Sequence, residues 1–126
     1  MAANPAPGWA KKPEHRVDLY PETKRVRVTY AGTVVADTTD ALRVEETGHG
    51  PVHYIPAKDM RLDLMKKTEH NTYCPFKGTA SYWTLAVGKD ASENAIWGYE
   101  TPYDEMARLA GYYAFYGNRV DSVEVG

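Results

Sequence analysis

The sequence predicts a mainly β, single-domain protein, and three observations support that prediction. The chain has 126 residues, with 25% charged and 43% apolar side chains, which is the composition of one globular domain with a real core. Apolar and polar residues alternate with a period of two in most segments, as they do in half-buried strands. Turn-forming residues separate these segments at hairpin spacing. We therefore expect a barrel-like or sandwich fold of about eight short strands with two short helical insertions.

The first part of the chain lacks a strand pattern. Residues 1–16 contain three prolines and four charged side chains, so we expect an arm that lies on the surface or is partly disordered. Trp9 is expected to hold this arm against an apolar patch, because an exposed tryptophan is unfavourable. Residues 17–126 are then expected to form the single β domain.

The alternation assigns the elements in chain order. Strands are expected at residues 25–29, 33–37, 41–46 and 52–56. In the next segment Met60 and Leu64 stand four residues apart, which indicates a short helix or two turns over residues 57–67. Residues 68–71 are expected to form a polar loop. The second half predicts strands at 79–87, 94–101, 112–116 and 119–125, with a helix that starts at Thr101–Pro102 and ends at Gly111.

Charge and cysteine content exclude several classes of protein. The net charge of -2 gives no electrostatic footprint for nucleic acid. No apolar run approaches the ~20 residues that would span a bilayer, and the N-terminus does not have the pattern of a secretory signal. One cysteine allows neither an intrachain disulfide nor a four-cysteine zinc site, and it suits a reducing compartment. The histidine spacings match no metal-ligand signature. We expect a cytoplasmic protein without a metal or cofactor.

Glu46 is the most informative polar residue. Leu42 and Val44 must face the core of their strand, because Arg43 cannot. Glu46 lies two residues further on and shares their face, whereas Glu45 points to solvent. An inward carboxylate needs a partner or a wet pocket. It can act as a general acid or base or anchor a ligand, or it can be a structural group paired with Lys77.

Lys77 and Cys74 lie in a turn that leads into the best strand candidate. Lys77 stands between Phe76 and Gly78, where its stem can cross apolar surface and its ammonium can reach a carboxylate. We therefore predict that Glu46 and Lys77 are neighbours in one site, with catalytic roles if the protein is an enzyme. Cys74 is a candidate ligand contact, although lone cysteines are mostly small buried hydrophobic groups.

Aromatic residues are the candidate walls of that site. The chain has ten tyrosines and three tryptophans. Tyr82, Trp97 and Tyr99 lie on predicted neighbouring strands and can form a wall for a small molecule, or they can fill a small β core. His53 and Tyr54 are further candidate ligand contacts. Because their strand alternates, only one of the two can face the same pocket as Glu46.

Four segments together resemble the domain-of-unknown-function 427 family. They are Thr72-x-Cys74-Pro75-Phe76-Lys77-Gly78-x-Ala80-Ser81-Tyr82, His53-Tyr54-Ile55-Pro56-x-x-Asp59, Ala95-Ile96-Trp97-Gly98-Tyr99 with Pro102, and Tyr113-Ala114-Phe115. The resemblance covers roughly residues 25–120 and implies a small β-tent fold, similar to that of the methionine-R-sulfoxide reductases, with a glutamate at position 46. It implies no established activity. The family has also carried a nucleotidyltransferase label, but this chain lacks the glycine-serine turn and paired aspartates with which such enzymes hold Mg²⁺.

The sequence leaves two classes of function open. The first is a small-molecule site, with or without acid/base catalysis, built from Glu46, Lys77 and the aromatic residues. The second is a structural or interaction module in which the same residues form a polar plug in the core. A cysteine-dependent redox enzyme is disfavoured, because no resolving partner for Cys74 exists.

Overall fold

The computed structural model describes residues 3–126, and it confirms the mainly β prediction. Strands account for 52% and short helices for 15% of the structure. Within the described residues, ten strands form two antiparallel sheets, neither of which closes into a barrel. The larger sheet has seven strands in the order β1 (Val17–Pro21), β4 (Leu42–Glu46), β5 (Val52–Pro56), β9 (Tyr112–Phe115), β8 (Asp90–Gly98), β7 (Gly78–Val87) and β6 (Met65–Cys74). The smaller sheet has the order β10 (Ser122–Val125), β2 (Val26–Tyr30) and β3 (Thr33–Thr38).

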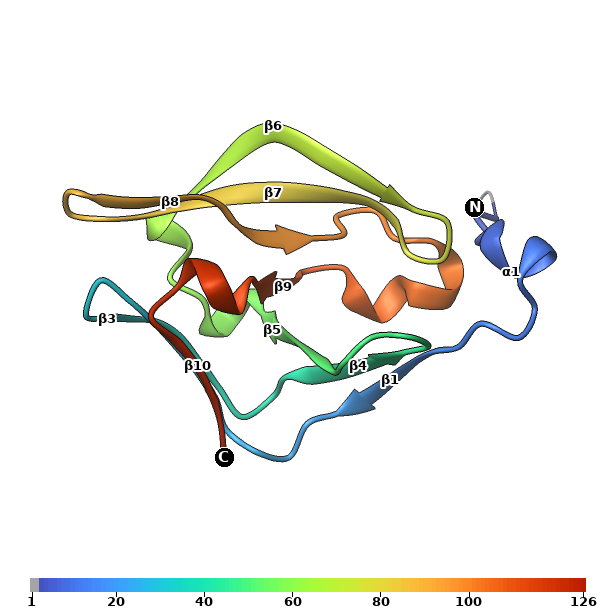
Figure 1. Ribbon diagram of the computed structural model, residues 1–126, viewed down its shortest axis with the longest axis horizontal. Helices are drawn as coiled ribbons and strands as arrows, with labels where there is room; N and C mark the ends of the chain where they lie inside the picture. The colour runs from blue at the N-terminus through green and yellow to red at the C-terminus, as the bar shows by residue number, and fades with distance from the viewer. Residues whose placement is uncertain (1–2) are drawn as a thin grey trace.

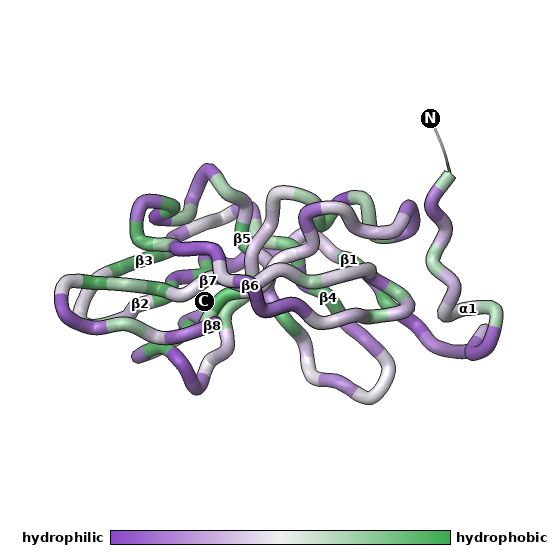
Figure 2. The backbone as a smooth tube through the Cα atoms, turned by 90° about the horizontal axis from the view of Figure 1, so that it is seen from above, coloured by the Kyte–Doolittle hydropathy of each residue, from purple (hydrophilic) through white to green (hydrophobic). Residues whose placement is uncertain are grey.

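The helical segments are short and lie at connections. They are α1 (Gly8–Lys11) and the 3-10 turns η1 (Ala57–Asp59), η2 (Leu62–Leu64), η3 (Asp104–Leu109) and η4 (Gly117–Arg119). The predicted turns at residues 57–67 therefore exist as η1 and η2. The molecule is elongated, with β2 and β3 at one end and α1 at the other (Figure 2).

The large sheet consists of two wings that diverge (Figure 1). We call β6, β7 and β8 the first wing, and β1, β4 and β5 the second wing. Strand β9 joins them, but its ladder to β5 has only two pairs, Ile55–Tyr113 and Pro56–Tyr112. On its other side β9 pairs with β8 through Ala114 and Phe115. The sheet is therefore open between the wings beyond Ile55.

Both faces of the large sheet are buried, each against a different set of residues. The first core cluster lies between the wings and contains Val17, Leu42, Val44, Tyr54, Phe76, Ala80, Tyr82, Tyr99, Met106, Leu109 and Ala114. The second lies against the small sheet and contains Val26, Val28, Val35, Ala36, Ala41, Ile55, Met60, Trp83, Leu85, Ala95 and Ile96. Strand alternation sends Tyr82 to the first cluster and Trp83 to the second. This is why β7 is buried on both faces near its middle.

Two strands of the structure were not predicted from the sequence. Residues 68–71, expected as a loop, belong to β6, a ten-residue edge strand paired with β7. Most of its side chains are exposed on both faces, so no apolar alternation marks it. Strand β1 was also missed. Val17 and Leu19 alternate there with Asp18 and Tyr20, a short signal that could have predicted it.

The boundaries of three further elements also required correction. Strand β8 begins at Asp90 rather than Asn94 and ends at Gly98, and Asn94 takes a left-handed conformation that turns Ala95 to the second cluster. Residues 117–119 form η4, so the last strand spans only Ser122–Val125. Helix η3 starts after Tyr103 without a side-chain cap, so Thr101 is not its N-cap.

Candidate functional site

Glu46 stands at the end of β4, on the face of Leu42 and Val44, as the alternation predicted. Its Oε1 accepts a hydrogen bond from the Lys77 ammonium, so the structure brings these two residues together. Its Oε2 lies 2.8 Å from His15 Nε2. The charged atoms are largely shielded, because Lys77 is only 8% exposed. Residues from three distant parts of the chain thus meet at one carboxylate.

Lys77 is held by the turn between β6 and β7. Its carbonyl accepts a hydrogen bond from the Tyr103 amide at 3.0 Å. The next residue, Gly78, has a φ of 118°, a conformation that other residues adopt only with strain. On the other side, the Phe76 ring stacks on His15 with a centroid distance of 4.1 Å. This turn therefore fixes both the lysine and the histidine that bind Glu46.

The surroundings of Glu46 determine its ionisation. Burial opposes the charged form, but the hydrogen bonds from Lys77 and His15 and the charge of Lys77 outweigh it. The pKa of Glu46 is therefore below its ordinary value, and the carboxylate is ionised near neutral pH.

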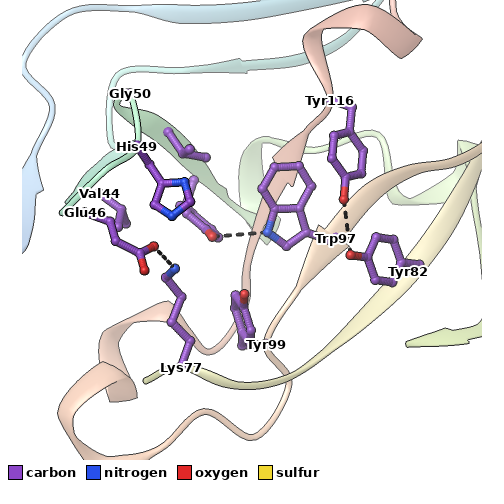
Figure 3. A pocket seen from close by; sticks show the side chains of 11 residues that line it. Val44, Glu46, His49, Gly50, Lys77, Tyr82, Trp97, Tyr99 and Tyr116 are labelled. Atoms are coloured by element: carbon purple, nitrogen blue, oxygen red, sulfur yellow. Dashed lines mark hydrogen bonds and ion pairs between the residues drawn. The ribbon is translucent and has the colours of Figure 1, made fainter. Parts of the chain in front are cut away.

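A cavity of about 350 Å³ opens beside the Glu46–Lys77 pair (Figure 3). Val44, Gly50 and Val52 form part of its lining, with His49 at the side. Its aromatic walls come from both wings of the sheet and from the segment after β9: Tyr54, Tyr82, Trp97, Tyr99 and Tyr116. The cavity therefore lies where the wings diverge, between the ion pair and a set of tyrosine hydroxyls.

The aromatic walls hold one another by hydrogen bonds. The Trp97 Nε1–H donates to the Tyr54 hydroxyl at 3.1 Å, and the Tyr82 and Tyr116 hydroxyls lie 3.2 Å apart. Burial raises the pKa of Tyr54 and that of Tyr99. Burial, together with the hydrogen bond to Tyr82, raises the pKa of Tyr116 to about 12. These hydroxyls therefore remain protonated near neutral pH, and each keeps a proton that it can donate.

Three of the donors have capacity left for a ligand. The Tyr99 hydroxyl has no hydrogen-bond partner within residues 3–126 and points into the cavity (Figure 3). Lys77 carries three N–H donors, and Glu46 is its one acceptor in that part of the chain. Tyr54 accepts from Trp97 and keeps its own proton to donate.

Two of the sequence candidates lie elsewhere. Cys74 is half-buried, packs against the first core cluster and does not line the cavity. His53 points to the other face of β5, where its Nε2 lies 2.8 Å from Glu22 Oε1. Of the adjacent pair, Tyr54 is thus the residue that faces the pocket of Glu46.

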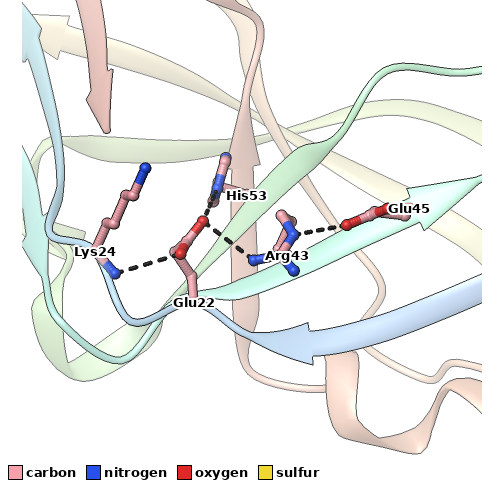
Figure 4. Close-up of polar contacts among 5 residues, drawn as sticks. All are labelled: Glu22, Lys24, Arg43, Glu45 and His53. Carbon is pink, nitrogen blue, oxygen red and sulfur yellow. Dashed lines mark hydrogen bonds and ion pairs between the residues drawn. The ribbon is translucent and has the colours of Figure 1, made fainter. Parts of the chain in front are cut away.

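His53 belongs to a separate polar network around Glu22 (Figure 4). Glu22 is 8% exposed and also accepts a hydrogen bond from Arg43 at 3.4 Å and one from the Lys24 amide at 3.3 Å. The bond from His53 is the main reason that the pKa of Glu22 falls to about 2. This network ties the loop after β1 to β4 and β5, which is a structural role.

Sequence reasoning missed three residues of the site. His15 falls in the arm expected on the surface, His49 between the strands expected at 41–46 and 52–56, and Tyr116 at the end of the strand expected at 112–116. The contact of His15 with Glu46 spans 31 residues, and no periodicity reports such a distant pair. Phe76 was the one sequence indication of this contact, because an aromatic side chain in a turn tends to pack against another residue that shields it from water.

The described residues suggest neither a metal centre nor a membrane segment. No group of three or more His, Cys, Asp and Glu side chains in residues 3–126 is arranged to hold a metal ion. In the same residues, none of the helices has the length and apolar character needed to cross a bilayer.

A comparison with known protein families matches most of the chain to one of them. The sequence pattern of a family described as a domain of unknown function (DUF427) matches residues 18–126. The chain belongs to the DUF427 family. This confirms the resemblance that the Cys74–Lys77 turn and its companion segments indicated. No curated protein matches the chain. In this DUF427 protein, Glu46, Lys77 and the aromatic walls lie inside the matched region, whereas His15 and Trp9 lie outside it.

Proposed function

We propose that the cavity beside Glu46 and Lys77 binds a small planar molecule that carries a hydrogen-bond acceptor, such as a carbonyl oxygen. One observation carries this proposal. Lys77, Tyr54 and Tyr99 all line one aromatic cavity with donor capacity left, and the Tyr99 hydroxyl has no partner within residues 3–126. This hydroxyl is accessible from the cavity, so a ligand acceptor could form a hydrogen bond with it in a partly shielded site.

The walls favour a flat ligand. The rings of Trp97 and Tyr116 lie 4.5 Å apart between centroids, and those of Tyr54 and Trp97 meet edge to face at 6.1 Å. Such surfaces offer π faces and edges to a planar group. An apolar cavity with a few convergent polar groups is the usual composition of a small-molecule site.

The charges favour a neutral acceptor over an ion. Glu46 already neutralises Lys77, so a ligand carboxylate would compete with Glu46 for a paired cation, and a ligand cation would lie close to the Lys77 ammonium. The raised pKa values of Tyr54 and Tyr99 keep their hydroxyls as donors.

Binding is favoured over acid/base catalysis by the ionisation of Glu46. A group that exchanges protons during turnover works best with a pKa close to the working pH. The pKa of Glu46 is instead lowered, so this carboxylate suits an anchor that orients Lys77. The alternative is a structural module, since Glu46 ties β4 to the β6–β7 turn and to residue 15. That alternative requires no ligand.

Three probes with one ring test the proposal. Benzamide, benzoate and benzylammonium place a neutral acceptor, an anion and a cation on the same planar group. We expect benzamide to bind most tightly, with the largest shift at the Trp97 indole N–H in a ¹H–¹⁵N NMR titration. Native mass spectrometry of freshly purified protein would reveal a natural ligand directly.

A single hydroxyl provides the decisive variant. Tyr99→Phe removes a hydroxyl that has no partner within residues 3–126, so stability should be nearly unchanged, whereas benzamide should bind about tenfold more weakly. Tyr20→Phe is the matched control, because Tyr20 is 40% exposed on β1 and lies outside the cavity. The proposal fails if none of the probes binds, or if both variants bind benzamide as the unchanged protein does.

A further inference from the structure

A second cavity lies on the opposite face of the large sheet. It has a volume of about 300 Å³ and lies between β5 and β9 on one side and β2 and β10 on the other. Its apolar lining includes Val26, Val28, Ile55, Phe115 and Val123. Val28 is completely buried and Val123 is 39% exposed, so the cavity runs from the core to the surface.

The two cavities meet at the opening in the sheet between β5 and β9. Both are lined by the same three residues, Val52, Trp97 and Tyr116. If the β5–β9 ladder continued beyond the Ile55–Tyr113 pair, its register would place Val52 opposite Tyr116. That pair does not form within the described ladder. The cavities are therefore separated by side chains and not by a hydrogen-bonded sheet.

A partition of side chains can open where a sheet cannot. Rotamers of partly exposed side chains interchange rapidly, whereas an antiparallel ladder must break hydrogen bonds to part. Trp97 and Tyr116 are both partly exposed. The Tyr116 ring contacts the Trp97 ring at a centroid distance of 4.5 Å, so a chain that passes between them must displace one ring. Tyr116 is also held by its hydroxyl contact with Tyr82 and by the Arg119 guanidinium 4.6 Å from its centroid.

Two polar side chains that line the second cavity already have partners. His53 contributes an imidazole, but its Nε2 is already engaged by Glu22. The hydroxyl of Tyr116 faces Tyr82 in the first cavity. Part of the lining is polar, but the other lining side chains are aliphatic or aromatic and suit a hydrocarbon group.

We infer that the ligand is elongated, with its planar, acceptor-bearing head in the first cavity and a short hydrocarbon tail that passes between Trp97 and Tyr116 into the second. This inference rests on the proposed function, because the head is the molecule proposed for the Tyr99 site. It adds the chemical class of the rest of the ligand, and it assigns Val26, Val28 and Val123 to the site.

A series of 4-alkylbenzamides tests the tail. Affinity for benzamide, 4-ethylbenzamide and 4-butylbenzamide should rise along the series by up to about fourfold for each methylene group that becomes buried. Val123→Trp should fill the second cavity from its exposed side. Benzamide should then bind unchanged, while 4-butylbenzamide should lose its advantage.

Val125→Trp is the matched control on the same strand. Val125 is 41% exposed, close to the value for Val123, but it does not line the cavity. This variant should keep the full gain along the series. Benzamide binding with no gain from the alkyl chain, or a gain that Val123→Trp leaves intact, overturns the inference and leaves the proposed function standing. If benzamide itself does not bind, the proposed function fails and the inference fails with it.

Discussion

The carboxylate of Glu46 holds two groups from elsewhere in the chain, and its removal has a cost that can be measured. Glu46→Gln keeps the shape of the side chain but leaves the Lys77 ammonium, at 8% exposure, without its counter-charge. We expect the free energy of unfolding to fall by about 1–3 kcal/mol, as for loss of a charged hydrogen bond in a shielded site. Urea denaturation at pH 7 measures this change.

The same variant should alter the dependence of stability on pH. The folded pKa of Glu46 lies below its ordinary value of 4.5, so on acidification the unfolded chain takes up the proton first. The stabilisation is complete above about pH 4.5 and is lost as the pH falls through the folded pKa. Glu46→Gln should therefore show a smaller loss of stability between pH 5 and pH 3. An unchanged slope would show that the pair contributes nothing to folding.

Glu22 should behave as a second acid-sensitive group, independent of the cavity. Its folded pKa of about 2 lies below the ordinary 4.5, so its contribution also disappears as the pH falls through that interval. Glu22→Gln should destabilise the protein at pH 7 and leave benzamide binding unchanged. Glu45→Gln is the control, because Glu45 shares Arg43 but its side chain is 51% exposed. Equal effects of the two variants in thermal unfolding would contradict the structural role of Glu22.

At the scale of elements, the close approach of β8 to β9 depends on Gly98. A Cβ at this position would stand 2.8 Å from the Tyr112 carbonyl oxygen, a backbone atom that cannot swing away. Gly98→Ala should therefore destabilise the fold by about 1–3 kcal/mol through overpacking. Gly117→Ala meets nothing within 4 Å and serves as the control. Differential scanning calorimetry of both variants would show whether the close approach matters.

The N-terminal arm is the second element whose contribution can be tested. We propose that residues 17–126 fold as a domain without it. In the full chain, the arm attaches through the Gly8 amide to the Pro75 carbonyl at 3.0 Å and through Trp9 against Phe76. A chain that starts at Val17 should keep its β circular dichroism but melt at a lower temperature, because Phe76 and Glu46 lose their covers. Loss of all folded structure would show that the arm is part of the domain.

Most of the strands that sequence reasoning found bury apolar side chains on at least one face. The alternation of Leu42 and Val44 predicted β4 and the inward direction of Glu46. That direction in turn led to the prediction that Glu46 pairs with Lys77. Strand β6 was missed because its side chains are exposed on both faces. Helix η3 was placed correctly, but its start was not. The carboxylates of Asp104 and Glu105, at the start of η3, accept hydrogen bonds from backbone amides of the N-terminal arm. These contacts join residues about a hundred positions apart, so local sequence patterns do not report them.

The site was predictable to the same extent. Alternation identified Tyr54, Tyr82, Trp97 and Tyr99 as candidates, and the structure places all four around one cavity. It could not choose between His53 and Tyr54, because that choice depends on which face of β5 the second sheet covers. The sequence could not predict the partition of side chains between the two cavities, because it arises where β5 and β9 diverge in space.

At the scale of the whole molecule, the two core clusters should unfold together. Strands β5, β7 and β8 contribute side chains to both, so neither cluster can lose its strands without exposing the other. We expect one cooperative transition. Variants that keep only Trp83, from the second cluster, or only Trp97, which packs against the first, should report the same urea midpoint by fluorescence. Two separated midpoints would show that the two core clusters unfold independently.

The outer edge of β6 affects how the protein behaves when many copies are crowded together. A strand at the end of a sheet presents free backbone groups that invite another chain to add to it. Here Lys66, Lys67 and Glu69 line that strand, and its pairing with β7 is interrupted between Lys67 and Asn71, where the ribbon bends (Figure 1). A bent, charged edge is a poor template for a flat neighbouring strand. Concentrated solutions should therefore resist fibril formation, and crystals should form through contacts other than a shared sheet.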